Sequence, residues 1–213
     1  TPKGVGVHPH RGFETVTIAY KGAVSNHDSQ GGSGTVYEGD VQWMTAASGI
    51  LHKEYHEKEY STTGGDFQMV QLWVNLPKEY KMSQPKYQPI KNEQIQRYII
   101  ENNGGEVEVI AGELYNVKGA ATTFTPMNIY NVKLNKGAQF SMNFPAHFNT
   151  GLLVIEGSIT INGSDEAPTD FFALMENEGE QFTIEATENA VVLVLSGEPI
   201  GEPIAAHGPF VMN

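Results

Sequence analysis

The sequence predicts an all-β protein built from two barrels, and three observations carry this prediction. Runs of alternating apolar and β-branched residues recur along the chain, such as ETVTIAYKG, FQMVQLWVNLP and EQFTIEATENAVVLVLSG. The 23 Gly and 11 Pro residues supply enough turn formers to separate many strands. The strand-like runs also recur in a similar order in the two halves of the chain, which indicates an internal duplication of a β-barrel.

The two halves can be followed element by element. In the first half, TVTIAYKGAV is followed by YEGDVQWMTAASGILHKEY and FQMVQLWVNLP; in the second, GLLVIEGSIT is followed by FFALMENEGEQFTIEA and AVVLVLSGEP. The polar stretch KEYKMSQPKYQPIKNEQIQ reads as a link, so we expect domains at 1–95 and 96–213. Helical patterns are weak, and the two candidates are Asn92–Ile99 and parts of LHKEYHEKEY.

Composition excludes several classes of function. The formal charge of −12 disfavours direct binding of nucleic acid, which requires clustered basic groups. No apolar run approaches the roughly 20 residues of a membrane helix. The chain has no cysteine, which rules out disulfides, thiolate nucleophiles and Cys-ligated metals. A cysteine-free chain without a visible signal peptide leads us to expect a cytoplasmic location.

Two histidines one residue apart, His8 and His10, open the first apolar run. On a strand, residues at i and i+2 point to the same face, so both imidazoles would point the same way. If this strand continued, Val16, Ile18 and Tyr20 would extend the same face into a barrel interior. A buried pair of imidazoles suggests a metal ion.

A second candidate set lies in the segment GDVQWMTAASGILHKEYHE, which contains His52, Glu54 and His56. On a strand, His52 and Glu54 would share a face, and together with the first pair they would give three imidazoles and one carboxylate. Such a set suits first-row transition metals. On a helix, His52 and His56 would share a face instead, so both alternatives stay open, with Gly49 and the barrel-like pattern favouring the strand.

Other residues near these pairs have less distinctive patterns. Glu14 has the same parity as His10 and is either an alternative ligand or a hydrogen-bond acceptor that orients an imidazole. We expect surface or packing roles for the isolated histidines, which are His27, His147 and His207. The aromatic or soft side chains near the candidate ligands could line a pocket or pack in the core; they are Phe13, Trp43 and Met44.

The arrangement HPHRGFET…GDVQWMTAASGILHKE…QLWVNLP resembles the pirin family of bicupins, and the tail GEPIGEPIAAHGPFVMN resembles the end of the pirin C-terminal half. The resemblance runs over nearly the whole chain. It implies two stacked cupin barrels of the jelly-roll type, with one metal ion in the N-terminal barrel. It also implies that relatives carry a further stretch before HPH, so the N-terminal barrel is expected to lack its first strands.

The resemblance implies the ligands as well: His8, His10, His52 and Glu54, with Glu54 rather than Glu14 as the carboxylate. The implied ion is a single divalent transition metal, iron(II) first, with Mn, Ni, Cu and Zn as alternatives. The second barrel offers only FPAHFNTG and EATENA at the matching positions, so no second metal is expected there.

Two functions from different classes follow from the resemblance. The first is a quercetin 2,3-dioxygenase-like oxidoreductase, which opens a flavonol ring with O2 and releases carbon monoxide, with Glu54 as catalytic base. The second is a non-catalytic, metal- or redox-responsive regulator that binds a transcription factor or a metabolic enzyme. The expected partners are therefore a flavonol-like molecule and O2, or another protein, and neither nucleic acid nor a membrane.

Overall fold

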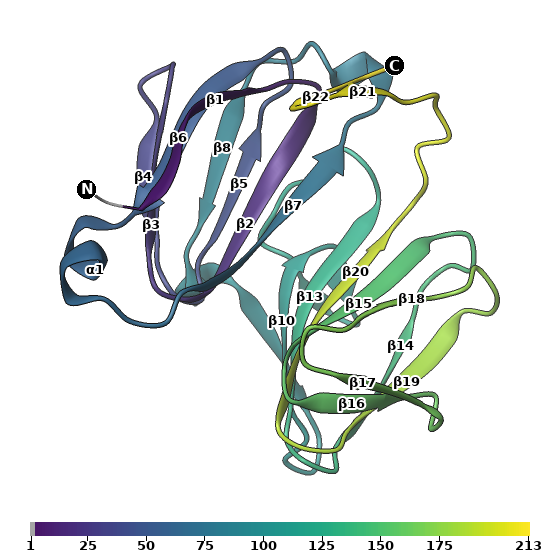
Figure 1. Ribbon diagram of the computed structural model, residues 1–213. Coiled ribbons are helices and arrows are strands. Elements are labelled where there is room, and N and C mark those ends of the chain that lie inside the picture. The colour runs from purple at the N-terminus through teal and green to yellow at the C-terminus, as the bar shows by residue number, and fades with distance from the viewer. Residues whose placement is uncertain (1–2) are drawn as a thin grey trace. The chain divides into compact units, whose positions relative to one another are not determined.

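The computed structural model describes residues 3–213, which are 56% strand and 6% helix. The predicted all-β class is confirmed. The chain divides into two compact units, the first formed by Thr1–Gln94 and Ile200–Asn213 and the second by Ile95–Pro199. Both units contain two larger antiparallel sheets, consistent with the cupin architecture (Figure 1).

The first unit contains two four-stranded sheets that enclose its interior. One has the strand order β1-β6-β3-β4 and the other the order β7-β2-β5-β8. The bounds of these strands are β1 Gly4–His10, β2 Phe13–Lys21, β3 Val24–Asp28, β4 Ser33–Val36, β5 Val41–Thr45, β6 Ile50–His56, β7 Gln68–Asn75 and β8 Lys86–Ile90.

The expected continuity of the first strand is wrong, because the chain turns between His10 and Phe13. Gly12 has a φ of +86°, and a Cβ there would lie 1.8 Å from the backbone oxygen of Val211. Glycine is the residue that tolerates both this conformation and this close approach. The turn places β1 and β2 in different sheets, so Val16 and Ile18 do not extend the face of the histidines.

The helical segments are short, and one of them, the 3-10 helix Lys78–Tyr80, lies outside the two expected places. The α-helix α1, Lys58–Thr63, overlaps the end of LHKEYHEKEY. The Asn92–Ile99 candidate is a 3-10 turn at Asn92–Gln94 followed by strand β9, Gln96–Ile100. Packing explains the difference, since Ile100 enters the core of the second unit and Tyr98, two residues earlier on the same face of β9, packs against that core. Within residues 3–213, no helix has the length and apolar character needed to cross a membrane.

The expected boundary near residue 95 agrees with the division of the chain, but residues 200–213, which were expected in the second domain, belong to the first unit. The hairpin of β21, Ala205–His207, and β22, Phe210–Met212, belongs to the first unit (Figure 1). Arg11 N donates to Pro209 O at 3.2 Å and Val211 N donates to Arg11 O at 3.0 Å. These hydrogen bonds tie the last residues of the chain to the turn that follows β1.

The second unit has a six-stranded sheet, β18-β15-β20-β13-β10-β9, and a four-stranded sheet, β14-β19-β16-β17, with a small hairpin of β11 and β12. Its core contains an apolar cluster that includes Val109, Tyr130 and Ile184. The bounds of its remaining strands are β10 Gly105–Ala111, β11 Glu113–Leu114, β12 Val117–Lys118, β13 Met127–Leu134, β14 Gln139–Asn143, β15 Asn149–Glu156, β16 Ser158–Ile161, β17 Asp165–Pro168, β18 Phe172–Leu174, β19 Gln181–Ala186 and β20 Ala190–Gly197.

Candidate metal centre

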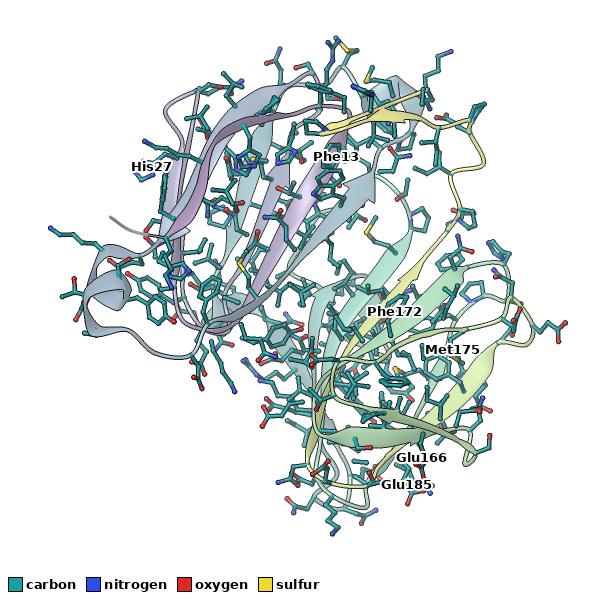
Figure 2. All side chains as sticks on the ribbon, viewed as in Figure 1. Phe13, His27, Glu166, Phe172, Met175 and Glu185 are labelled. Carbon is teal, nitrogen blue, oxygen red and sulfur yellow. The ribbon has the colours of Figure 1, made fainter. Side chains whose placement is uncertain are left out.

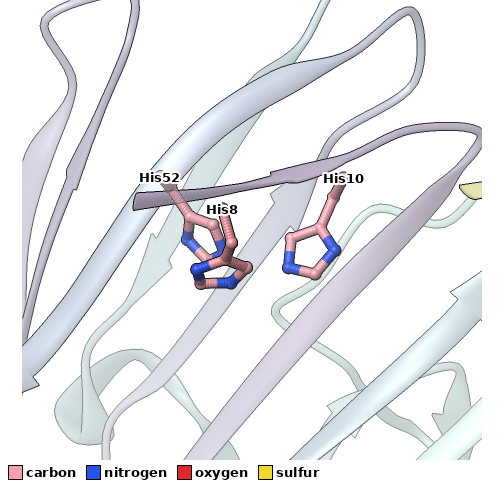
Figure 3. A group of neighbouring side chains, drawn as sticks. All are labelled: His8, His10 and His52. Carbon is pink, nitrogen blue, oxygen red and sulfur yellow. The ribbon is translucent and has the colours of Figure 1, made fainter. Parts of the chain in front are cut away.

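Three of the four predicted ligands come together inside the first unit. His8 and His10 lie on β1, and His52 lies directly opposite His8 on the neighbouring strand β6. The ring centroids are 4.3 Å apart for His8 and His52, and 4.8 Å apart for each of the other two pairs. One ligating nitrogen from each ring lies within 4.8 Å of the others (Figure 3). We call these three residues the histidine group.

The histidine group offers unpartnered ring nitrogens to a metal ion, and two of its three members, His10 and His52, are buried. Both ring nitrogens of His10 and Nε2 of His52 have no hydrogen-bond partner. The Nδ1 of His8 donates to the backbone oxygen of Gly6 at 2.8 Å, which leaves Nε2 as its free lone pair. A buried polar atom without a partner is costly, and metal coordination would remove that cost.

The electrostatics keep two of these rings neutral. Burial, together with a smaller effect of the neighbouring His8, lowers the pKa of His10 from 6.5 to about 4. Burial also lowers the pKa of His52 to about 3, with additional contributions from His8 and His10. Neutral imidazole is the form that binds metals, so both rings are ready to ligate at neutral pH.

Glu54 lies beside the histidine group but is not one of its members. It follows His52 by two residues on β6, so the predicted strand geometry of this segment is confirmed. Its carboxylate is 6% exposed and accepts hydrogen bonds from Gln71 Nε2 on β7. Burial raises the pKa of Glu54, while the hydrogen bond from Gln71 and the nearby His8 act in the opposite direction.

Glu14, the alternative carboxylate, points to the other face of its sheet. Its neighbour Phe13 faces the histidine group, with its ring centroid 5.2 Å from that of His10. Because successive side chains on a strand alternate, Glu14 must face away. It is fully buried and accepts a 2.6 Å hydrogen bond from Thr45 Oγ1. Burial raises the pKa of Glu14, as it does for Glu54.

The remaining histidines lie outside the histidine group. The ring of His56 packs against Phe67 with centroids 4.3 Å apart. His27 is exposed on the hairpin of β3 and β4 (Figure 2), and His207 is exposed on β21. His147 is exposed and lies 3.6 Å from a carboxylate oxygen of Glu198.

The structure places residues around the site that the sequence did not point to. Trp73 on β7 contacts the ring of Phe13 at 4.5 Å and that of His10 at 5.6 Å between centroids. Trp43, the tryptophan expected near the site, pairs with Val16 and therefore shares the face of Glu14. Gln71 and Trp73 are two residues apart on β7, so their side chains share one face of that strand. Because β7 pairs directly with β2, this spacing could have indicated that both side chains lie near the site.

Met44 and Tyr87 line the same interior. Met44 pairs with Thr15 and with Tyr87, and it clusters with Ile50. The Tyr87 hydroxyl is buried, and burial raises its pKa, with the nearby Asp28 acting in the same direction. Asn26, directly opposite Glu54 on β3, is 1% exposed and has no partner for either amide atom. Polar side chains therefore share the interior with the histidine group.

Two antiparallel barrels, one with a buried histidine group, define a bicupin protein with a candidate metal centre. Two family models match the sequence, "Pirin" over residues 2–74 and "Pirin C-terminal cupin domain" over residues 129–213. The chain belongs to the pirin family.

Similar proteins agree with this assignment. A quercetin 2,3-dioxygenase structure from Acinetobacter baumannii is 48% identical, with a TM-score of 0.96, and the match covers 100% of this chain and 74% of that one. A Pseudomonas aeruginosa protein named "Putative quercetin 2,3-dioxygenase PA2418" is 44% identical over 99% of this chain and 73% of its own length. A bacterial pirin from Escherichia coli, in complex with nickel(II), is 25% identical with a TM-score of 0.75, covering 92% of this chain and 77% of that one.

Proposed function

We propose that this chain is a metal-dependent dioxygenase of the pirin type that opens a flavonol ring with O2 and releases carbon monoxide. The observation that carries the proposal is the histidine group, in which the buried rings of His10 and His52 have nitrogens without a hydrogen-bond partner. The names of the Acinetobacter baumannii and Pseudomonas aeruginosa relatives support the choice of substrate.

The proposed ligands are His8, His10 and His52, with Glu54 as the fourth. Iron(II) is the proposed ion, with Mn, Ni, Cu and Zn as alternatives, and the nickel complex of the Escherichia coli pirin supports a first-row metal. When bound, such an ion supplies Lewis acidity that lowers the pKa of a hydroxyl group and redox chemistry toward O2. The cytoplasmic location expected from the cysteine-free sequence stays a prediction.

The residues of the chain have separate roles in this proposal. Glu54 accepts the proton of the substrate hydroxyl, and its raised pKa brings it closer to the range of an effective base at neutral pH. Trp73 provides an apolar ring beside His10, on which an aromatic substrate ring can stack. Trp73 is 52% exposed, so its ring is accessible to a ligand from solvent, whereas Phe13 is buried and packs against Trp73.

The test is carbon monoxide release from quercetin in air, with protein reconstituted with Fe(II). We expect release by the parent and loss of release in His52→Ala, because one ligand is removed. The matched control is His56→Ala, which removes a histidine from the same strand but outside the histidine group. Release by the parent and His52→Ala at the same rate would contradict the metal-centred mechanism. No release by iron-loaded parent would favour the regulatory function.

A further inference from the structure

The carboxylate of Glu54 is held from the opposite sheet of the first unit. Gln71 Nε2 lies 3.1 Å from Glu54 Oε1 and 3.2 Å from Glu54 Oε2. Glu54 belongs to the sheet that carries the histidine group, whereas Gln71 belongs to the sheet of β7, β2, β5 and β8. This contact therefore joins the two sheets next to the proposed ligands.

The orientation of the Gln71 amide is determined by its neighbours. Gln71 Nε2 also donates to Thr17 Oγ1 at 3.2 Å, and Thr17 is the residue directly opposite Gln71 across β2 and β7. The amide group has two N–H donors. One N–H donates to the Thr17 hydroxyl oxygen, and the other is shared between the two carboxylate oxygens of Glu54. An ionised carboxylate can only accept, which requires the nitrogen rather than the oxygen of Gln71 to face Glu54.

This arrangement limits the freedom of Glu54 without using all of its acceptor capacity. An ionised carboxylate has about four lone-pair sites, and one shared N–H leaves several of them available. His52 lies on the same face of β6, two residues before Glu54, so the restrained carboxylate lies beside the histidine group. A carboxylate that is already oriented loses less conformational entropy when it binds an ion.

We propose that Gln71, anchored by Thr17, is the positioning residue that orients Glu54 as the fourth metal ligand. This inference rests on the proposed metal centre and adds a residue from the opposite sheet to it. Hydrogen bonds to a ligating group commonly contribute about 10–100-fold to metal affinity, and this sets the expected size of the effect.

The test is a double-mutant cycle on Ni(II) affinity, measured by competition with a chelator. Gln71→Met keeps an unbranched side chain of similar length but removes the donor. We expect it to weaken Ni(II) binding about 10–100-fold in the parent and to have little further effect in the Glu54→Gln background. Equal losses in both backgrounds, or no loss in the parent, would overturn the positioning role.

A matched control and a second variant keep the test independent of folding. Gln42 lies on β5, directly opposite Thr17 on its other side, and is also buried. Gln42→Met should leave Ni(II) affinity unchanged, since Gln42 is not among the partners of Glu54 in residues 3–213.

Thr17→Val removes the hydroxyl that anchors the Gln71 amide and should give a smaller loss of Ni(II) affinity than Gln71→Met. The Co(II) absorption spectrum should change in Gln71→Met but not in Gln42→Met.

The cycle also separates failure of this inference from failure of the proposed metal centre. If Glu54→Gln weakens Ni(II) binding but Gln71→Met does not, only the positioning role is overturned. If the parent binds no Ni(II), or if Glu54→Gln binds it as tightly as the parent, the proposed ligand set is itself wrong and the role of Gln71 falls with it.

Discussion

Burial sets the protonation state of His10 and His52, and this has a consequence for stability. Both have a lowered pKa in the folded protein, about 4 and about 3 respectively, against 6.5 for an exposed histidine. Between these values the unfolded chain binds more protons than the folded one, so stability falls as the pH is lowered through this range. The stability is not reduced by this effect above about pH 6.5, where both histidines are neutral in the folded and in the unfolded chain.

We therefore predict that the metal-free protein loses stability between pH 7 and pH 5. Each histidine contributes a slope of up to about 1.4 kcal/mol per pH unit below its unfolded pKa. Urea unfolding at several pH values measures this slope. His52→Leu should reduce this slope by about the contribution of one histidine. The buried carboxylates have opposing effects on the slope, and these effects cancel when His52→Leu is compared with the parent. An unchanged slope in His52→Leu would be evidence against a neutral, buried His52.

The two buried carboxylates near β1 and β2 should behave differently toward metal. Glu54 lies on the same face of β6 as His52, whereas Glu14 lies on the face of β2 that points away from the histidine group and accepts a hydrogen bond from Thr45. We predict that Glu54→Gln lowers Ni(II) affinity by at least about tenfold, while Glu14→Gln changes it little. Isothermal titration of both variants with Ni(II) measures this. The reverse order would show that Glu14 is the ligand.

At the scale of elements, the most consequential contact is a buried lysine that connects three segments. Lys81 is 1% exposed, and its Nζ donates to Gly12 O at 2.8 Å, Asn75 Oδ1 at 2.7 Å and Val211 O at 2.9 Å. These acceptors lie in the turn after β1, at the end of β7 and in β22. Burial lowers the pKa of Lys81, while the charge of Glu202 acts in the opposite direction, and the three hydrogen bonds satisfy the donors of the buried ammonium.

We predict that Lys81→Met destabilises the first unit by about 2–4 kcal/mol, because three buried acceptors lose their donor. The C-terminal hairpin should also become more sensitive to protease, since one of its ties is lost. Urea unfolding and limited proteolysis with mass spectrometry measure the two effects. Lys78→Met is the control, because Lys78 is exposed. Equal stability of the two variants would contradict this role for Lys81.

At the scale of the whole molecule, the metal should stabilise the first unit, because all proposed ligands lie there. Both tryptophans of the chain, Trp43 and Trp73, also lie in the first unit, so their fluorescence reports on its unfolding. At about 100 times its dissociation constant, a ligand that binds only the folded state adds about 2.7 kcal/mol.

We predict that Ni(II) at this excess raises the free energy of unfolding reported by tryptophan fluorescence by about 2.7 kcal/mol. His52→Ala should lose this increase because it lacks one ligand. A full increase in His52→Ala would place the bound Ni(II) somewhere other than the histidine group.

The sequence by itself determined the all-β class and the two histidine-bearing segments. Both depend on local patterns: alternation along a strand is a property of neighbouring residues, and so is the i, i+2 spacing of His8 and His10. The resemblance carried by these same segments indicated the family, which the family models confirm. The three histidines that it implied as ligands do lie together.

Only the tertiary structure decided which residues surround the histidines. The turn at Gly12 ended the first strand and placed Glu14 on the face of its sheet that points away from the histidines, although parity alone had allowed it as a ligand. Gln71, Trp73 and Lys81 are far from His8 in sequence, and Lys81 lies in a stretch that reads as a polar link. Strand pairing brings Gln71 and Trp73 to the site, and hydrogen bonds bring Lys81 to the turn after β1. Alternation along a strand shows which side chains share a face, but not which residues of another sheet that face meets.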